Sequence, residues 1–157
     1  MINTKNLLWQ ELGVVNNIDK NILSWLDDDK SLTAKLKQKF KSFAVEILTQ
    51  EIQKPHKNEL EVVDFSGDCV IREVQLLGDN QIVVFARSVI PITSDTEDLL
   101  KIGSKPLGEV LFNDKSIKRG DLQVTNSKST WGRRSAFTIG TTKLLVSEFF
   151  LENLYEI

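Results

Sequence analysis

The stretch Val70–Ile90, VIREVQLLGDNQIVVFARSVI, decides the fold because it contains two apolar runs separated by turn residues. Gly78, Asp79 and Asn80 stand between the runs and are typical of a tight hairpin turn. Two strands joined in this way pair antiparallel. The stretch therefore predicts a β-hairpin that belongs to an antiparallel sheet.

Each strand of this hairpin carries an arginine among apolar neighbours. Side chains alternate between the two faces of a strand, so Arg72 shares a face with Val70 and Val74, and Arg87 shares one with Phe85. A charge on an apolar face is costly unless another group pairs with it. Both arginines are therefore candidates for binding a ligand, and the carboxylate-matching fork of arginine suggests an acid.

A carboxylate occupies a similar position near the end of the chain. Glu148 shares a strand face with Val146 and Phe150. Two arginines and one carboxylate suggest a closed pocket for a small anion that also carries a hydrogen-bonding group. The alternative is an internal salt bridge in which Arg72 or Arg87 pairs with Glu148, and the pattern favours neither.

The rest of the chain adds helices around further strands. Asp19 and Ser31 can cap two helices, Ser94 with Glu97 forms a possible capping box, and Pro106 can open a short helix. Beyond the hairpin, strands are expected at about 43–49, 117–125, 132–139 and 142–151. These elements predict an α+β fold with an antiparallel sheet of about six strands flanked by helices.

The composition excludes several classes of function. The chain has 157 residues, 41% of them apolar, and a formal net charge of −2, which suits one domain over residues 1–157 and no nucleic-acid partner. One cysteine, Cys69, and one histidine, His56, cannot form a Cys/His zinc site. We expect no metal, no organic cofactor and no membrane insertion, and we expect a cytoplasmic location. His56 is expected in an exposed loop.

Two short stretches offer further anion contacts. If Pro106 opens a helix, the backbone N–H groups of Leu107 and Gly108 are free to bind an anion, and Gly108 keeps the approach open. The N–H of Leu32, just after Ser31, has a weaker claim. The alternative is an ordinary proline-initiated turn.

Arginine occurs twice more, in Trp131–Ser135, where Arg133 and Arg134 point to opposite faces of a strand. Nothing in the spacing selects which of the two faces a pocket.

These segments, taken in order, resemble the chorismate pyruvate-lyases, small cofactor-free enzymes at the head of ubiquinone synthesis. The resemblance runs from about residue 23 to residue 155. It rests on Leu23–Leu26, Asp29–Thr33, Ile71–Val74, Ala86–Pro91, Lys105–Gly108 with Leu111-Phe112, Trp131–Ser135 and Leu144–Leu151. Residues 114–130 match poorly, and no role is carried over to them.

The resemblance implies a buried site beneath helical flaps in a monomer. Arg72 would bind the ring carboxylate together with the N–H of Leu107, and Glu148 would contact the ring hydroxyl, which makes Arg72 and Glu148 the catalytic pair. Arg87 would serve a neighbouring ligand site or handle the pyruvyl carboxylate, and the backbone of Leu32 would add a donor.

The activity that the resemblance implies is elimination of pyruvate from chorismate to give 4-hydroxybenzoate. A product with the hydroxyl at position 3 stays open. The rival interpretation is a non-catalytic domain that binds a small acid, related to the effector domains of bacterial transcription regulators.

Overall fold

The computed structural model describes residues 2–155, and the predicted hairpin lies in the interior of its sheet, with a further strand paired on each side. The hairpin consists of β3 (Cys69–Gly78) and β4 (Gln81–Pro91). Asp79 and Asn80 form the turn with φ of 49° and 66°, the left-handed conformation that such a two-residue turn requires.

One irregularity in this hairpin determines which side chains share a face. Leu77 pairs with Ile82, but Leu76 pairs with Val84, so Val83 is an extra residue in β4. This β-bulge shifts the register by one residue. As a result Arg72 lies opposite Ser88, and Arg87 lies opposite Glu73.

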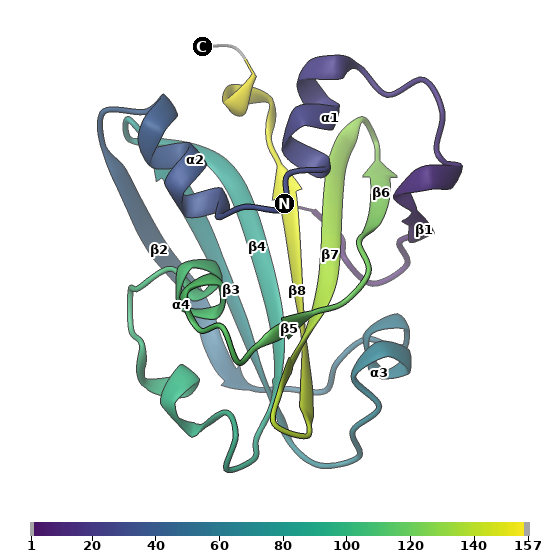
Figure 1. The fold of residues 1–157 in the computed structure, drawn as a ribbon, viewed down its shortest axis with the longest axis vertical. Helices are drawn as coiled ribbons and strands as arrows, with labels where there is room; N and C mark the ends of the chain where they lie inside the picture. The colour runs from purple at the N-terminus through teal and green to yellow at the C-terminus, as the bar shows by residue number, and fades with distance from the viewer. Residues whose placement is uncertain (1, 156–157) are drawn as a thin grey trace.

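The sheet is antiparallel throughout, with the strand order β1-β6-β7-β8-β4-β3-β2 and with β5 paired to β7 (Figure 1). The other strands are β1 (Gln10–Glu11), β2 (Phe43–Ile52), β5 (Lys118–Arg119), β6 (Gln123–Ser127), β7 (Thr130–Ile139) and β8 (Thr142–Phe150). The α+β class with an antiparallel sheet is thus confirmed. Within residues 2–155 the sheet has eight strands rather than about six. The strand expected at 117–125 is divided into β5 and β6, and the two-residue β1 is too short to show a periodicity.

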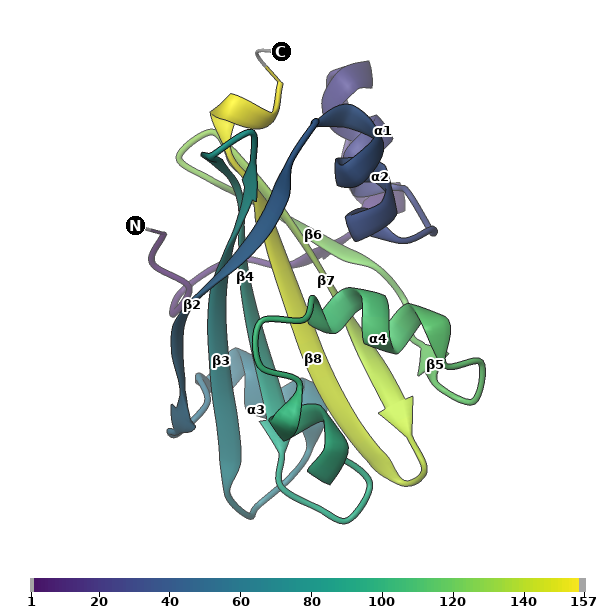
Figure 2. The same ribbon diagram turned by 90° about the vertical axis from the view of Figure 1, so that its left-hand side faces the viewer.

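Helices cover both faces of this sheet. On one face, which we call the inner face, lie α1 (Lys20–Leu26), α2 (Leu32–Lys39) and α4 (Leu107–Asn113), as Figure 2 shows. The opposite, outer face is covered by α3 (Lys57–Val63). Short 3-10 helices complete the structure at Leu12–Val14, Glu97–Lys101 and Glu152–Leu154.

The predicted N-terminal helix caps are confirmed. The side chain of Asp19 accepts a hydrogen bond from the N–H of Asn21 at 2.8 Å, and Ser31 accepts one from the N–H of Ala34 at 3.2 Å. α4 likewise begins directly after Pro106.

Two local predictions are wrong. The segment after Pro55 is the helix α3 rather than a loop, because Glu59 reaches back and accepts a hydrogen bond from the N–H of His56 at 2.8 Å. The predicted capping box of Ser94 and Glu97 is also absent, since the helix there is a 3-10 turn that starts after Thr96.

The core has a part on each face. On the inner face, the apolar surfaces of α1, α2 and α4 pack on the sheet, with Trp25, Leu36, Leu111, Val84 and Phe150 among the buried side chains. The outer core, under α3, contains Val63, Ile71, Val89 and Leu145. Within residues 2–155 the α-helices have seven or eight residues, and none has the length and apolarity needed to cross a membrane.

Candidate functional site

Two neighbouring rows of paired residues carry polar side chains across the inner face of the sheet. Strand pairing places Arg72 of β3, Ser88 of β4, Val146 of β8 and Ser135 of β7 directly beside one another in that order. The neighbouring row consists of Val74, Ala86, Glu148 and Arg133. Directly paired residues point to the same face, so the topology brings Arg72, Glu148 and Arg133 to one side of the sheet.

Arg72 is buried with a relative exposure of only 2%. Its Nη1 donates to Gln50 Oε1 at 2.6 Å, and its Nη2 donates to the carbonyl oxygen of Lys105 at 3.1 Å. Both acceptors are neutral, and within residues 2–155 no carboxylate forms an ion pair with this guanidinium. Desolvation lowers the pKa of Arg72. This buried cation can therefore gain a bound carboxylate as its counter-charge.

Glu148 is held by the sheet residue next to it. Arg133 Nε donates to Glu148 Oε1 at 3.0 Å, and Arg133 Nη1 donates to the carbonyl oxygens of Trp25 at 3.0 Å and Asp28 at 2.8 Å. The interaction fixes the carboxylate and also ties the end of α1 to the sheet. Arg133 is therefore the member of the arginine pair that belongs to the inner face.

The second oxygen of Glu148 faces α4. A methyl group added at Gly108 would lie 4.0 Å from Glu148 Oε2, which is an ordinary contact distance. A side chain at this position would thus occupy space beside the carboxylate. The glycine leaves that space free, in keeping with the open approach expected from the sequence.

A small cavity of about 40 Å³ lies over this carboxylate. Its walls include Leu32, Gly108 and Glu148, together with Lys30, Ser31, Phe112, Arg119, Arg133, Ser135, Phe137 and Val146. On this measure roughly 10–15 Å³ holds one water molecule, so the cavity has room for a few waters and not for an aromatic acid while the helices stay in place. A larger, open hollow of about 690 Å³ beside Gln75 and Phe85 contains none of the predicted site residues.

The first residues of the two helices above the cavity are Leu32 and Leu107, both buried. Their N–H groups belong to first helical turns and have no partner within the helix. Lys105, two residues before Leu107, is the residue whose carbonyl accepts from Arg72. The structure thus brings Arg72, Glu148, Leu107, Gly108 and Leu32 to the inner face, where Leu32, Gly108 and Glu148 line the cavity and Arg72 and Leu107 lie outside its wall.

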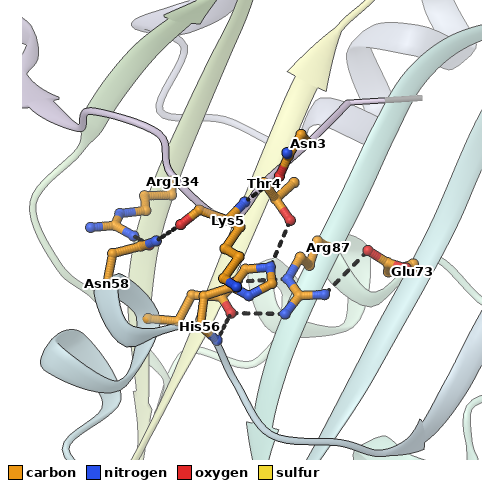
Figure 3. A network of polar contacts seen from close by, with 9 residues as sticks. Asn3, Thr4, Lys5, His56, Asn58, Glu73, Arg87 and Arg134 are labelled. Atoms are coloured by element: carbon orange, nitrogen blue, oxygen red, sulfur yellow. Dashed lines mark hydrogen bonds and ion pairs between the residues drawn. The ribbon is translucent and has the colours of Figure 1, made fainter.

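Arg87 lies on the outer face, so the expectation that both arginines line one pocket is wrong. Its Nε and Nη2 each donate to the carboxylate of Glu59 at 2.8 Å, and its Nη1 donates to Glu73 at 3.2 Å. Figure 3 shows its guanidinium beside His56 and directed toward Glu73. Desolvation opposes the charge, but hydrogen bonds and charges of Glu59 and Glu73 outweigh it and raise the pKa of Arg87.

The register shift at Val83 is the physical reason for this separation. The alternative of an internal salt bridge describes Arg87 correctly, although its partners are Glu59 and Glu73 rather than Glu148.

Arg134 and His56 also belong to the outer face. Arg134 donates to Gln123 Oε1 and Asn58 Oδ1, both at 2.8 Å, and stacks over Trp9 with 4.6 Å from its guanidinium carbon to the ring centre. Desolvation lowers its pKa to about 10. His56 is not an exposed bystander, since its Nε2 lies 3.0 Å from Thr4 Oγ1.

Two inner-face residues could not be predicted from the sequence. Gln50, which holds Arg72, sits in a strand of mixed polarity that gives no signal for a site. Arg119, which lines the cavity, comes from the stretch to which no role was carried over. Only the pairing of β5 with β7 brings Arg119 to the inner face.

Comparison with known proteins identifies the family. A family model described as chorismate lyase matches residues 3–157. A probable chorismate pyruvate-lyase of Pseudomonas aeruginosa is 32% identical over 168 residues, covering 96% of this chain and 94% of the relative. Another from Psychromonas ingrahamii is 34% identical over 167 residues, covering 92% and 89%.

Among solved structures, the possible transcriptional regulator YydK from Bacillus subtilis matches with a TM-score of 0.53 at 11% identity, covering 73% of this chain and 61% of that one. At this identity the likeness concerns the fold alone. The family match, by contrast, spans nearly the whole sequence, and the chain belongs to the chorismate lyase family.

Proposed function

We propose that this protein is a chorismate pyruvate-lyase that releases 4-hydroxybenzoate and pyruvate from chorismate. The observation that carries the proposal is Arg72, a buried guanidinium with two neutral acceptors and no carboxylate partner within residues 2–155. A ligand carboxylate would supply the missing charge. Membership of the chorismate lyase family supplies the identity of the acid.

The substrate ring has a carboxylate at one end and a hydroxyl at the other. In our proposal Arg72 binds the ring carboxylate, assisted by the N–H of Leu107. Glu148 accepts a hydrogen bond from the ring hydroxyl, and the backbone of Leu32 contributes from the opposite helix. Glu148 belongs to the row next to that of Arg72, which suits a small ring that spans the two groups.

The reaction needs few catalytic groups because it creates an aromatic ring. The bond from ring carbon 3 to the enolpyruvyl oxygen breaks, and carbon 4, which bears the hydroxyl, loses its proton. The enolpyruvyl group gains one proton at its methylene carbon and leaves as pyruvate, so the atoms balance. Either Glu148 carries this proton, or it passes directly within the substrate while Glu148 orients the hydroxyl. In both routes the protein supplies orientation and a site without bulk water.

The size of the cavity indicates that the helices over the inner face move when a ligand binds. A space of about 40 Å³ is too small for the substrate, so in our proposal α2 and α4 separate for entry and for release of the product. Release can therefore limit turnover. We further propose that the protein acts as a monomer, since all the proposed groups come from one chain, and that it works in the cytoplasm and supplies ubiquinone synthesis.

The test is the product formed from chorismate by the purified protein without added metal or cofactor. We expect 4-hydroxybenzoate, identified by chromatography, and an equal amount of pyruvate, measured with lactate dehydrogenase. Binding of chorismate with neither product would instead indicate the non-catalytic acid-binding domain. Formation of 3-hydroxybenzoate would contradict the placement of the hydroxyl at Glu148.

A further inference from the structure

Chorismate carries a second carboxylate, and its position on the ring predicts where a second cation is needed. The enolpyruvyl group is attached to the carbon next to the one that bears the hydroxyl. With the hydroxyl at Glu148, the second carboxylate must lie near Glu148 and away from Arg72. Two like charges would then meet in a cavity with little water, which is unfavourable without a cation between them.

The arginines already described cannot supply this cation. Arg133 donates to Glu148 and to two backbone carbonyls, and Arg72 belongs to the other end of the ring. Arg87, to which the resemblance would give the pyruvyl carboxylate, lies on the outer face and is neutralised by Glu59 and Glu73.

Arg119 is the remaining arginine of the cavity wall. It pairs with Phe137 across β5 and β7, which directs its side chain to the inner face. Although the residue as a whole is exposed, its guanidinium turns toward the sheet: Nε donates to Ser135 Oγ at 3.3 Å, and the guanidinium carbon lies 5.8 Å from the centre of the Phe137 ring. Ser135 is buried and belongs to the same row as Arg72.

The charge of Arg119 has no direct partner among residues 2–155. No carboxylate there forms an ion pair with it. Desolvation, followed by the charge of Arg133, lowers its pKa, and Glu148 opposes this at longer range. A second anion in the cavity would thus stabilise the charged guanidinium of Arg119, which lies in the field of the Arg133 cation.

On this geometry we propose that Arg119 determines specificity by binding the enolpyruvyl carboxylate of chorismate. The inference rests on the proposed function. Arg72 and Arg119 then stand on opposite sides of Glu148. The row from Arg72 to Ser135, the serine that accepts from Arg119, spans three strand spacings or about 14 Å. Product carries only the carboxylate at Arg72, so Arg119 discriminates the diacid substrate from the monoacid product.

The experiment compares chorismate with 4-hydroxybenzoate in Arg119→Ala. We expect kcat/KM for chorismate to fall about 10- to 100-fold, because a charge-assisted contact is lost. The Kd of 4-hydroxybenzoate, measured by titration calorimetry, should change less than about threefold. Arg119→Lys should recover part of the chorismate activity.

The matched control is Lys118→Ala, which removes the same charge from the same strand on the opposite face. It should leave both ligands unaffected. Equal weakening of chorismate and 4-hydroxybenzoate in Arg119→Ala would overturn the inference in favour of a general structural role. An unchanged kcat/KM for chorismate in Arg119→Ala would also overturn it. A selective loss of chorismate activity in Lys30→Ala would do the same, since Lys30 also lines the cavity.

Failure of the proposed function gives a different result. In that case the parent protein forms neither 4-hydroxybenzoate nor pyruvate from chorismate. The Kd values of chorismate and 4-hydroxybenzoate are then measured for the parent protein and for Arg119→Ala, in place of the reaction rates. A selective loss of chorismate affinity supports Arg119, and no such loss overturns it.

Discussion

The two arginines of the β3–β4 hairpin are both buried, yet their surroundings differ in charge. Arg72, on the inner face, has an amide and a carbonyl as partners, whereas Arg87, on the outer face, has two carboxylates. Their exposures are 2% and 5%, so burial does not separate them. The difference lies in which guanidinium is already neutralised, and this distinguishes a ligand-binding residue from a structural one.

The two faces also differ in how their buried charges affect the stability of the protein. On the outer face, Glu59 binds Arg87 and also accepts from the N–H of His56 at the start of α3, so one carboxylate joins the helix to β4. On the inner face the unpaired cation makes the ligand-free protein less stable than it could be. Ligand binding should offset that penalty.

The largest expected effect is on stability, from Arg87→Met. This change leaves Glu59 as a buried carboxylate without its cation, which should lower the free energy of unfolding by about 3–5 kcal/mol. Urea denaturation measures the loss. The folded protein should keep its kcat/KM for chorismate within about threefold, because Arg87 lies on the outer face and is paired there with Glu59 and Glu73.

The control for this variant adds Glu59→Gln. The amide oxygen can still accept the hydrogen bond from the N–H of His56, and no unpaired charge remains at that position. The double variant should recover most of the lost stability. A large loss of activity in the folded single variant would instead place Arg87 in the catalytic machinery.

The next largest effect should come from Arg72→Met. In contrast to Arg87→Met, this variant should lose ligand binding and activity but keep its stability. Affinity for 4-hydroxybenzoate and kcat/KM for chorismate should fall at least about 30-fold, from loss of roughly 2–5 kcal/mol of charge-paired binding. The ligand-free stability should be unchanged or higher, because a desolvated cation without a counter-ion is removed. Turnover near the parental rate would contradict the assignment of Arg72.

The effect of Glu148→Gln, which keeps the shape of the side chain and removes its charge, should be confined to the chemical step. If Glu148 acts as the base, kcat should fall about 100-fold or more. If it only orients the hydroxyl, a fall of about 10-fold fits the loss of one charged hydrogen bond. Single-turnover rates measure the chemical step apart from product release, and unchanged rates would reduce Glu148 to a packing role.

The same contrast explains how far the sequence could predict the site. Alternation alone identified Arg72 and Glu148 as charges on apolar strand faces, and both lie on the inner face. Without a bulge, the Asp79-Asn80 turn would place Arg72 opposite Arg87. The extra residue Val83 shifts the pairing by one and moves Arg87 to the other face. A bulge depends on packing around both strands, so the hydrophobic pattern did not reveal it.

Elements fixed by local chemistry were predicted better than those fixed by distant contacts. The side chains of Asp19 and Ser31 start helices with their own neighbours, and those starts are confirmed. By contrast, α3 depends on Glu59, whose carboxylate is held by Arg87 from another element. Arg119 reaches the cavity through a two-residue strand that no periodicity can indicate.

The smallest expected effect concerns motion, since the inner face must open for its ligand and the outer face need not. Lys37 of α2 and Glu109 of α4 form an exposed ion pair at 3.3 Å that joins the two helices over the cavity. Glu109→Gln should speed dissociation of 4-hydroxybenzoate by at most about fivefold, because exposed pairs contribute only about 0.2–1 kcal/mol. Stopped-flow displacement measures this rate. High salt should speed release from the parent protein and have little effect on the variant, because screening weakens the same ion pair. A variant that releases product no faster than the parent would show that separation of α2 and α4 is not the slow step.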